Sequence, residues 1–105
     1  MGIRGDVPAN VKTTVRRVLV VDDELDTAET LSFLLRDAGH QVEFAINGYS
    51  AIELAHRLRP DIIFLDLGLP DIDGCQLARQ LRRVPGLERA RIVAVTGLGR
   101  EAENV

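Results

Sequence analysis

Apolar residues along this chain fall into short continuous runs and longer stretches with helical spacing. Three runs of four aliphatic or aromatic residues stand at 18–21, 62–65 and 92–95. Continuous runs of this length are typical of strands that are buried on both faces of a parallel sheet. The segment 41–47 instead alternates apolar and polar residues, which predicts a half-exposed strand at a sheet edge.

Between these strands, apolar residues recur at the three- and four-residue spacing of a helix. The three helical stretches run from Asp26 to Gly39, from Gly48 to Pro60 and from Asp73 to Pro85. Asp26 and Glu29 have the spacing of a capping box, so we expect the first helix to begin there. The same spacing of Asp73 and Gln76 predicts the start of the third helix.

Strands and helices therefore alternate from one end of the pattern to the other, beginning and ending with a strand. This order favours an α/β fold, a doubly wound parallel sheet with helices on both faces. With the alternating strand at an edge, we expect the strand order 2-1-3-4. Residues 1–15 lack any period and predict a flexible N-terminal leader, which leaves 16–105 as one domain.

Composition excludes several classes of protein. The formal net charge is -3, and there are three phenylalanines, one tyrosine and no tryptophan, which argues against direct binding of nucleic acid. The single cysteine, Cys75, can form neither an internal disulfide nor a cysteine-based zinc site. No apolar run approaches the roughly 20 residues of a membrane span. We therefore expect a cytoplasmic protein without a membrane segment.

Acidic and hydroxyl side chains follow three of the predicted strands. Asp22 and Asp23 end the first, Asp66 ends the third and Thr96 ends the fourth. The first and third strands flank the point where the winding reverses, where ligands bind in such sheets. Three carboxylates brought together there repel one another unless a cation or proton joins them, and oxygen ligands suit Mg²⁺. A carboxylate can also attack phosphorus, and Thr96 could donate to a phosphoryl oxygen.

Each of these residues also has a simpler interpretation. An Asp-Asp pair after a strand often caps the next helix, and a threonine at a strand end often reflects β-propensity alone. Asp71 and Asp73 are best interpreted as turn and N-cap residues, not as ligands. The combination of acids at matching strand ends favours the metal and phosphoryl interpretation for Asp22, Asp23 and Asp66.

Three segments together resemble the signature segments of receiver domains in two-component response regulators. They are residues 18–24, 61–74 and 93–97, and the resemblance extends over about 16–105. It implies a flavodoxin-like fold and a phosphoacceptor module of a phosphorelay. A histidine kinase or a phosphotransfer domain would donate the phosphoryl group. Such a module catalyses only its own phosphorylation and dephosphorylation, so we expect no enzyme acting on a separate substrate.

The resemblance also implies roles for individual residues. Asp66 would be the phosphoacceptor. Asp23 would bind Mg²⁺ directly, Asp22 would assist through water, and the backbone carbonyl of Gly68 would complete the protein ligands. Thr96 would be the switch hydroxyl that turns toward the phosphoryl group.

The sequence departs from the family in one respect. Receivers carry a lysine at the end of a fifth strand, followed by a fifth helix, whereas the sole lysine here is Lys12. We therefore expect a C-terminally truncated receiver without the fifth strand, whose exposed fourth strand favours self-association.

Two other functions stay open at this point. One is a truncated receiver-like domain that binds proteins without being phosphorylated. The other is a magnesium-dependent phosphohydrolase with an aspartyl nucleophile, as in haloacid-dehalogenase-like enzymes. Those enzymes carry a second acid two residues after the nucleophile, where this chain has Gly68, so turnover of phosphate esters is disfavoured.

Overall fold

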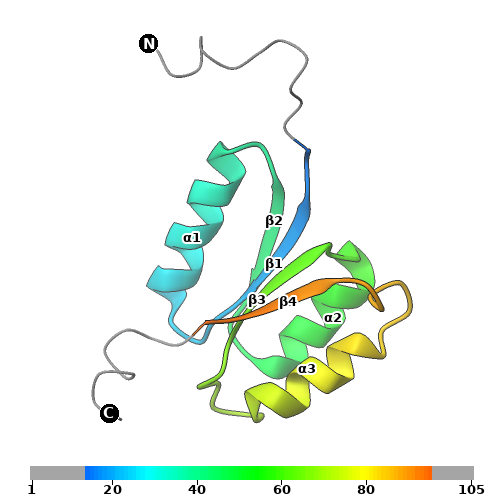
Figure 1. Cartoon of the computed structure of the whole chain (residues 1–105). Helices are drawn as coiled ribbons and strands as arrows, with labels where there is room; N and C mark the ends of the chain where they lie inside the picture. The colour runs from blue at the N-terminus through cyan, green and yellow to red at the C-terminus, as the bar shows by residue number, and fades with distance from the viewer. Residues whose placement is uncertain (1–13, 96–105) are drawn as a thin grey trace, which may run out of the picture.

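The computed structural model describes residues 14–95 of the chain (Figure 1). Strands and helices alternate there as the apolar pattern predicts. Their bounds are β1 Arg17–Val21, α1 Leu25–Asp37, β2 Gln41–Ala45, α2 Gly48–Leu58, β3 Ile62–Asp66, α3 Gly74–Arg82 and β4 Arg91–Val95. Most of the predicted leader, residues 1–13, and Thr96 lie outside the described residues.

The strands form one parallel sheet in the order β2-β1-β3-β4, so the predicted order is confirmed. In β1, Val18 pairs with Val42 of β2 on one side and with Ile62 of β3 on the other. The alternating strand β2 lies at an edge, where one face meets solvent, as its sequence predicts. The winding reverses between β1 and β3, which are direct neighbours.

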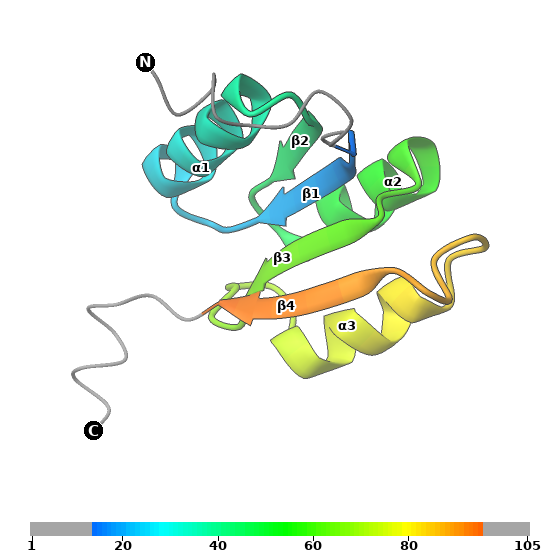
Figure 2. The ribbon, with the colours of Figure 1, turned by 45° about the horizontal axis from the view of Figure 1, so that its top comes forward.

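Helices cover the two faces of the sheet unequally (Figures 1 and 2). On one face α2 and α3 enclose the larger core, and on the other α1 packs over a smaller one. Successive strand residues point to opposite faces, so β1 gives Leu19 to the first core and Val18 and Val20 to the second. All three are at most 2% exposed, which fixes β1 in the middle of the fold.

The start of α1 differs from the prediction. The helix begins at Leu25 with Glu24 as its N-cap residue, so the predicted start at Asp26 was wrong. No side chain caps this end, and Thr27 instead donates its hydroxyl to Glu24 Oε1 at 3.3 Å. In contrast, Asp73 caps α3 as predicted, accepting the Gln76 N–H at 3.2 Å.

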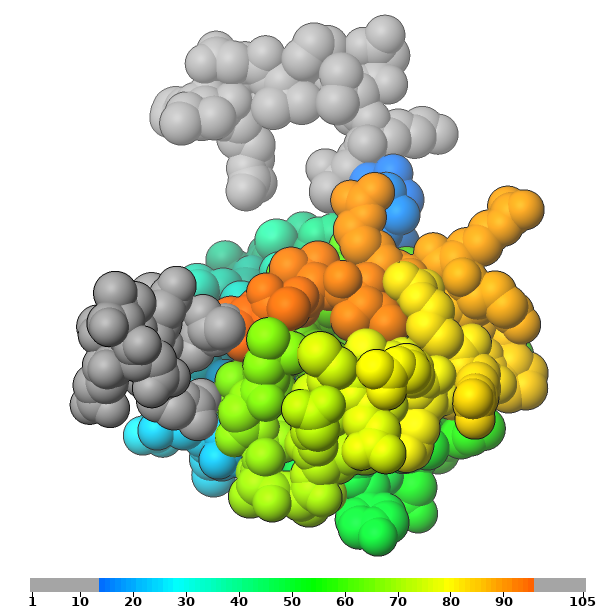
Figure 3. Space-filling view, turned by 60° about the horizontal axis from the view of Figure 1, so that its bottom comes forward, coloured from blue at the N-terminus to red at the C-terminus, as the bar shows by residue number. Residues whose placement is uncertain are grey.

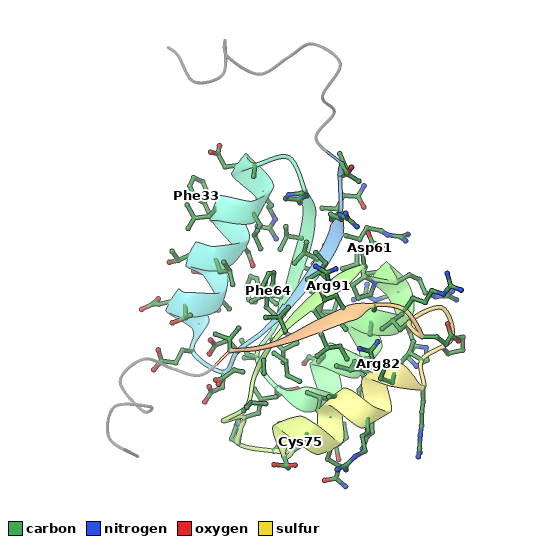
Figure 4. All side chains as sticks on the ribbon, viewed as in Figure 1. Phe33, Asp61, Phe64, Cys75, Arg82 and Arg91 are labelled. Atoms are coloured by element: carbon green, nitrogen blue, oxygen red, sulfur yellow. The ribbon has the colours of Figure 1, made fainter. Side chains whose placement is uncertain are left out.

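Apolar side chains remain exposed around α1 and β4. On α1, Phe33 is 65% exposed and points away from the sheet (Figure 4), and Val95 on β4 is 40% exposed. In the space-filling view, β4 reaches the surface above α3 and the loop that precedes it (Figure 3). Exposed apolar surface on β4 was expected from the sequence. Among the described residues, no helix is long and apolar enough to cross a membrane.

Candidate functional site

The carboxylates predicted to meet at the reversal point do so. Val21 of β1 pairs with Leu65 of β3, and the next residues, Asp22 and Asp66, stand at the same edge of the sheet. Asp22, Asp23 and Asp66 each present a carboxylate oxygen, and these oxygens lie within 4.8 Å of one another. The parallel register therefore builds an acidic cluster from two segments more than 40 residues apart.

Asp66 is the most buried member of the cluster. It is the last residue of β3 and only 3% exposed, and it pairs in register with Val95 of β4. Its Oδ1 accepts the N–H of Gly68 at 3.1 Å, which orients the carboxylate in a tight turn. A buried carboxylate needs hydrogen bonds or a cation to balance its lost hydration.

Asp22 orders the turn that leads from β1 into α1. Its backbone N–H donates to the carbonyl of Ala45, and its Oδ1 accepts the N–H of Glu24 at 2.9 Å. Partial burial raises the pKa of the Asp22 carboxyl above its ordinary value. The Glu24 hydrogen bond opposes this rise in the pKa, and repulsion from Asp66 and Asp23 adds to it.

Asp23 supplies the test of whether a metal ion fits. Its Oδ1 is buried and accepts no hydrogen bond from the part of the chain that the structure describes. A buried, unsatisfied carboxylate oxygen is costly, and a divalent cation among the three acids would satisfy it. The donor set is oxygen only, which suits Mg²⁺. The residues present therefore fit a magnesium ion.

The loop after Asp66 is held in place by a contact that the sequence did not reveal. Asp71 accepts the N–H of Gly48 with both carboxylate oxygens at 3.0 Å and that of Tyr49 at 3.4 Å. It therefore caps α2 from a loop 23 residues away in sequence. The prediction of a simple turn residue was incomplete, because no local pattern points to so distant a partner.

Two glycines let this loop lie close to its neighbours. A Cβ on Gly74 would stand 2.8 Å from Leu67 Cα and 2.7 Å from Leu67 Cδ2, and one on Gly48 would stand 2.4 Å from Ile72 Cγ2. Gly74 therefore keeps α3 against the backbone between Asp66 and Gly68. The predicted metal ligand Gly68 lies in this constrained turn, with its N–H on Asp66.

Thr96, the predicted switch hydroxyl, lies outside the described residues. Cys75 at the start of α3 is exposed and forms no disulfide in the described structure (Figure 4). What the described residues assemble is an acidic cluster whose oxygen donors suit a hard cation, and it includes Asp66, whose carboxylate is a group able to act as a nucleophile.

Comparisons with known proteins agree with this geometry. The model of the response regulator receiver domain family matches residues 18–105. A response regulator receiver protein of Anaeromyxobacter sp. (strain Fw109-5) is 42% identical over 81 residues, which are 76% of this chain and 34% of that protein. The DNA-binding dual master transcriptional regulator RpaA of Synechocystis sp. is 34% identical over 85% of this chain and 37% of its own length. This chain thus spans about a third of either relative.

A solved structure gives the same picture. The CheY-like receiver domain from Methylobacillus flagellatus superimposes with a TM-score of 0.74 at 33% sequence identity. The match covers 83% of this chain and 74% of that one.

Proposed function

The chain belongs to the response regulator receiver domain family, and from this we propose that it accepts a phosphoryl group on Asp66 with the help of Mg²⁺. The observation that best supports this role is the convergence of three carboxylate oxygens within 4.8 Å at the ends of β1 and β3. Receivers are signalling modules, so turnover of a separate metabolite is not expected.

In the proposed reaction, an oxygen of Asp66 attacks the phosphorus of a phosphohistidine. The bond from phosphorus to the histidine nitrogen breaks as the new oxygen–phosphorus bond forms, and the product is an acyl phosphate. The Gly68 N–H that donates to Asp66 Oδ1 helps to fix the orientation of the attacking carboxylate. Later hydrolysis of the acyl phosphate would return the chain to its resting state.

Asp23, Asp22, Asp66 and the carbonyl of Gly68 would hold the magnesium ion. Once bound, the ion supplies positive charge that offsets the phosphoryl oxygens during transfer. The buried Oδ1 of Asp23 and the raised pKa of Asp22 both support a cation at this place. Thr96 would donate its hydroxyl to a phosphoryl oxygen, and we keep this role as a proposal.

The partners follow from the same chemistry. A histidine kinase or phosphotransfer domain would present its phosphohistidine to the carboxyl edge of the sheet.

We assign this function to residues 16–105 and none to 1–15. The exposed edge of β4 would also favour self-association. DNA binding in the name of the Synechocystis relative belongs to that protein, of which this chain spans 37%.

Phosphorylation is testable with the purified chain. Incubation with acetyl phosphate and Mg²⁺ should add the mass of one phosphoryl group to the parent and none to Asp66→Asn. Omitting Mg²⁺ and adding EDTA should abolish the gain. If the parent, shown to be folded by circular dichroism, gains no phosphoryl group, the chain is better described as a receiver-like domain that binds proteins without being phosphorylated.

A further inference from the structure

A polar pocket lies at the opposite end of the sheet from the acidic cluster. It has a volume of about 190 Å³ and is formed where β1, β3 and β4 begin. Its lining residues are Arg16, Arg17, Arg59, Pro60, Asp61, Gly86, Arg89 and Ala90. Four of the ten arginines in residues 14–95 therefore surround one small pocket, in a chain whose net charge is -3. Five-residue strands separate it from the acids by roughly 16 Å.

Asp61 connects the strands that form this pocket through hydrogen bonds to Arg17 and Arg91 (Figure 4). Its backbone N–H donates to the Arg17 carbonyl at 2.7 Å, and its own carbonyl accepts the Arg91 N–H at 2.9 Å. Its carboxylate accepts the Arg17 N–H at 2.9 Å and lies 3.6 Å from the Arg17 guanidinium. These contacts join the starts of all three strands, and the one negative charge offsets Arg17 alone.

Arg59 is held in an unusual conformation beside the pocket. Its φ is 53°, which makes it the one non-glycine residue with positive φ in the described range. A Cβ on Gly86 would stand 2.9 Å from Arg59 Nη1, so the guanidinium lies directly against the Gly86 backbone. A left-handed arginine at a helix end where glycine fits better is a departure of the kind that gathers at ligand sites.

Arg16 and Arg89 complete the set of uncompensated charges. Neither side chain makes a hydrogen bond or ion pair with another residue of the 14–95 range. Arg89 lies on a segment braced by Arg82, whose guanidinium donates to the carbonyls of Leu87, Glu88 and Ala90 (Figure 4). Attraction between a cation and the C-terminus of α2 is enough to explain the position of Arg59. It does not explain the arginines that two further segments bring to the same pocket.

We propose that this pocket binds a phosphate-bearing anion. Planar guanidinium groups bind phosphate oxygens in pairs, and three uncompensated cations match a multiply charged oxyanion better than a single carboxylate. The volume lies below the roughly 300–1,000 Å³ of pockets for drug-sized ligands. It therefore accepts a short inorganic polyphosphate or the phosphate end of a larger molecule such as a nucleotide. Binding here does not require phosphorylation of Asp66.

The test uses ¹⁵N-labelled full chain carrying Asp66→Asn, in EDTA, so that the acidic cluster takes no metal-bound phosphate. Titration with pyrophosphate at fixed ionic strength should shift the amide resonances of residues 16, 17, 59, 61 and 86–90, and leave those of 22–24 and 66–68 in place. Adding Arg16→Ala and Arg89→Ala together should weaken binding by about tenfold or more. Arg79→Ala, on the exposed face of α3, is the matched control and should change affinity by less than about twofold.

A parallel titration with ATP separates the two sources of phosphate. Equal affinity for ATP and pyrophosphate assigns recognition to the phosphates alone, and tighter binding of ATP adds a contribution from the nucleoside. If adding Arg16→Ala and Arg89→Ala leaves the affinity for pyrophosphate unchanged, the assignment of the pocket is overturned. The assignment is also overturned if pyrophosphate shifts the amide resonances of surface arginines all over the chain. The same holds if acetate at equal ionic strength causes the same shifts.

Discussion

Gly74→Ala tests how closely the loop after Asp66 depends on its contact with α3. The added Cβ would stand 2.8 Å from Leu67 Cα, about 0.6 Å inside the 3.4 Å at which ordinary contact begins. Overpacking of this kind costs about 1–3 kcal/mol, and the better helix propensity of alanine returns less than about 1 kcal/mol. We expect a net loss of about 1–2 kcal/mol, which corresponds to a fall in Tm of roughly 5–15 °C.

The same displacement should weaken magnesium binding. Leu67 connects Asp66 to Gly68, so moving its backbone moves one proposed ligand relative to another. Changes just outside a metal's ligands typically lower affinity by about tenfold or more, and we expect that effect here. Calorimetric titration with Mg²⁺, alongside thermal denaturation followed by circular dichroism, measures both consequences in one set of samples.

Gly39→Ala is the matched control for this experiment. Gly39 has φ of 101° and nothing within 4 Å of an added Cβ, so alanine there costs about 1 kcal/mol through backbone conformation alone. It lies between α1 and β2, at the end of the sheet opposite the acids. Its Tm should fall while its magnesium affinity stays within about twofold of the parent. Parent-like magnesium affinity in Gly74→Ala, despite lost stability, would refute the proposed coupling between loop and site.

Three further predictions concern the cap, the acidic cluster and the sheet edge. Asp71→Ala removes the bonds from the Gly48 and Tyr49 N–H groups and should lower the free energy of unfolding in urea by about 1–2 kcal/mol; an unchanged midpoint would contradict this. Burial raises the pKa of the Asp22 carboxyl in the folded state. The stability that the protonated carboxyl contributes is therefore fully present below the pKa that Asp22 has in the unfolded chain, and it is lost as pH rises through the pKa that Asp22 has in the folded chain. In EDTA at pH 7, Asp22→Asn should therefore have a higher Tm than the parent, and a melting series should show this difference in Tm shrinking toward pH 4. Adding Mg²⁺ at pH 7 should reverse the sign of the difference. Sedimentation should show self-association of the parent that Val95→Lys reduces, and a parent that stays monomeric at high concentration would remove the case for it.

The sequence predicted those features that depend on periodicity and strand order. Continuous apolar runs identified β1 and β3, and the parallel register then brought Asp22 and Asp66 to one edge. The alternation in residues 41–47 correctly placed β2 at the sheet edge. Such patterns are visible in one dimension because each reports burial over a whole element.

Features that depend on contacts between distant segments could not be predicted in this way. The capping of α2 by Asp71 joins residues 23 positions apart, and the arginine pocket gathers side chains from three separate segments of the chain. The predicted start of α1 was wrong because the Glu24 N–H donates to Asp22, and the helix then begins at Leu25 without a side-chain cap. The roles of Thr96 and Gly68 remain predictions.

The most direct test of the phosphoacceptor assignment is to locate the modified residue. Borohydride reduces the acyl phosphate of an aspartate to the alcohol, releasing phosphate and leaving homoserine at that position. After incubation with acetyl phosphate and Mg²⁺, peptide mass mapping should find this conversion at Asp66 and at no other acid. Conversion at Asp22 or Asp23 instead, or at no residue of a folded chain, would contradict the assignment of Asp66 as the phosphoacceptor.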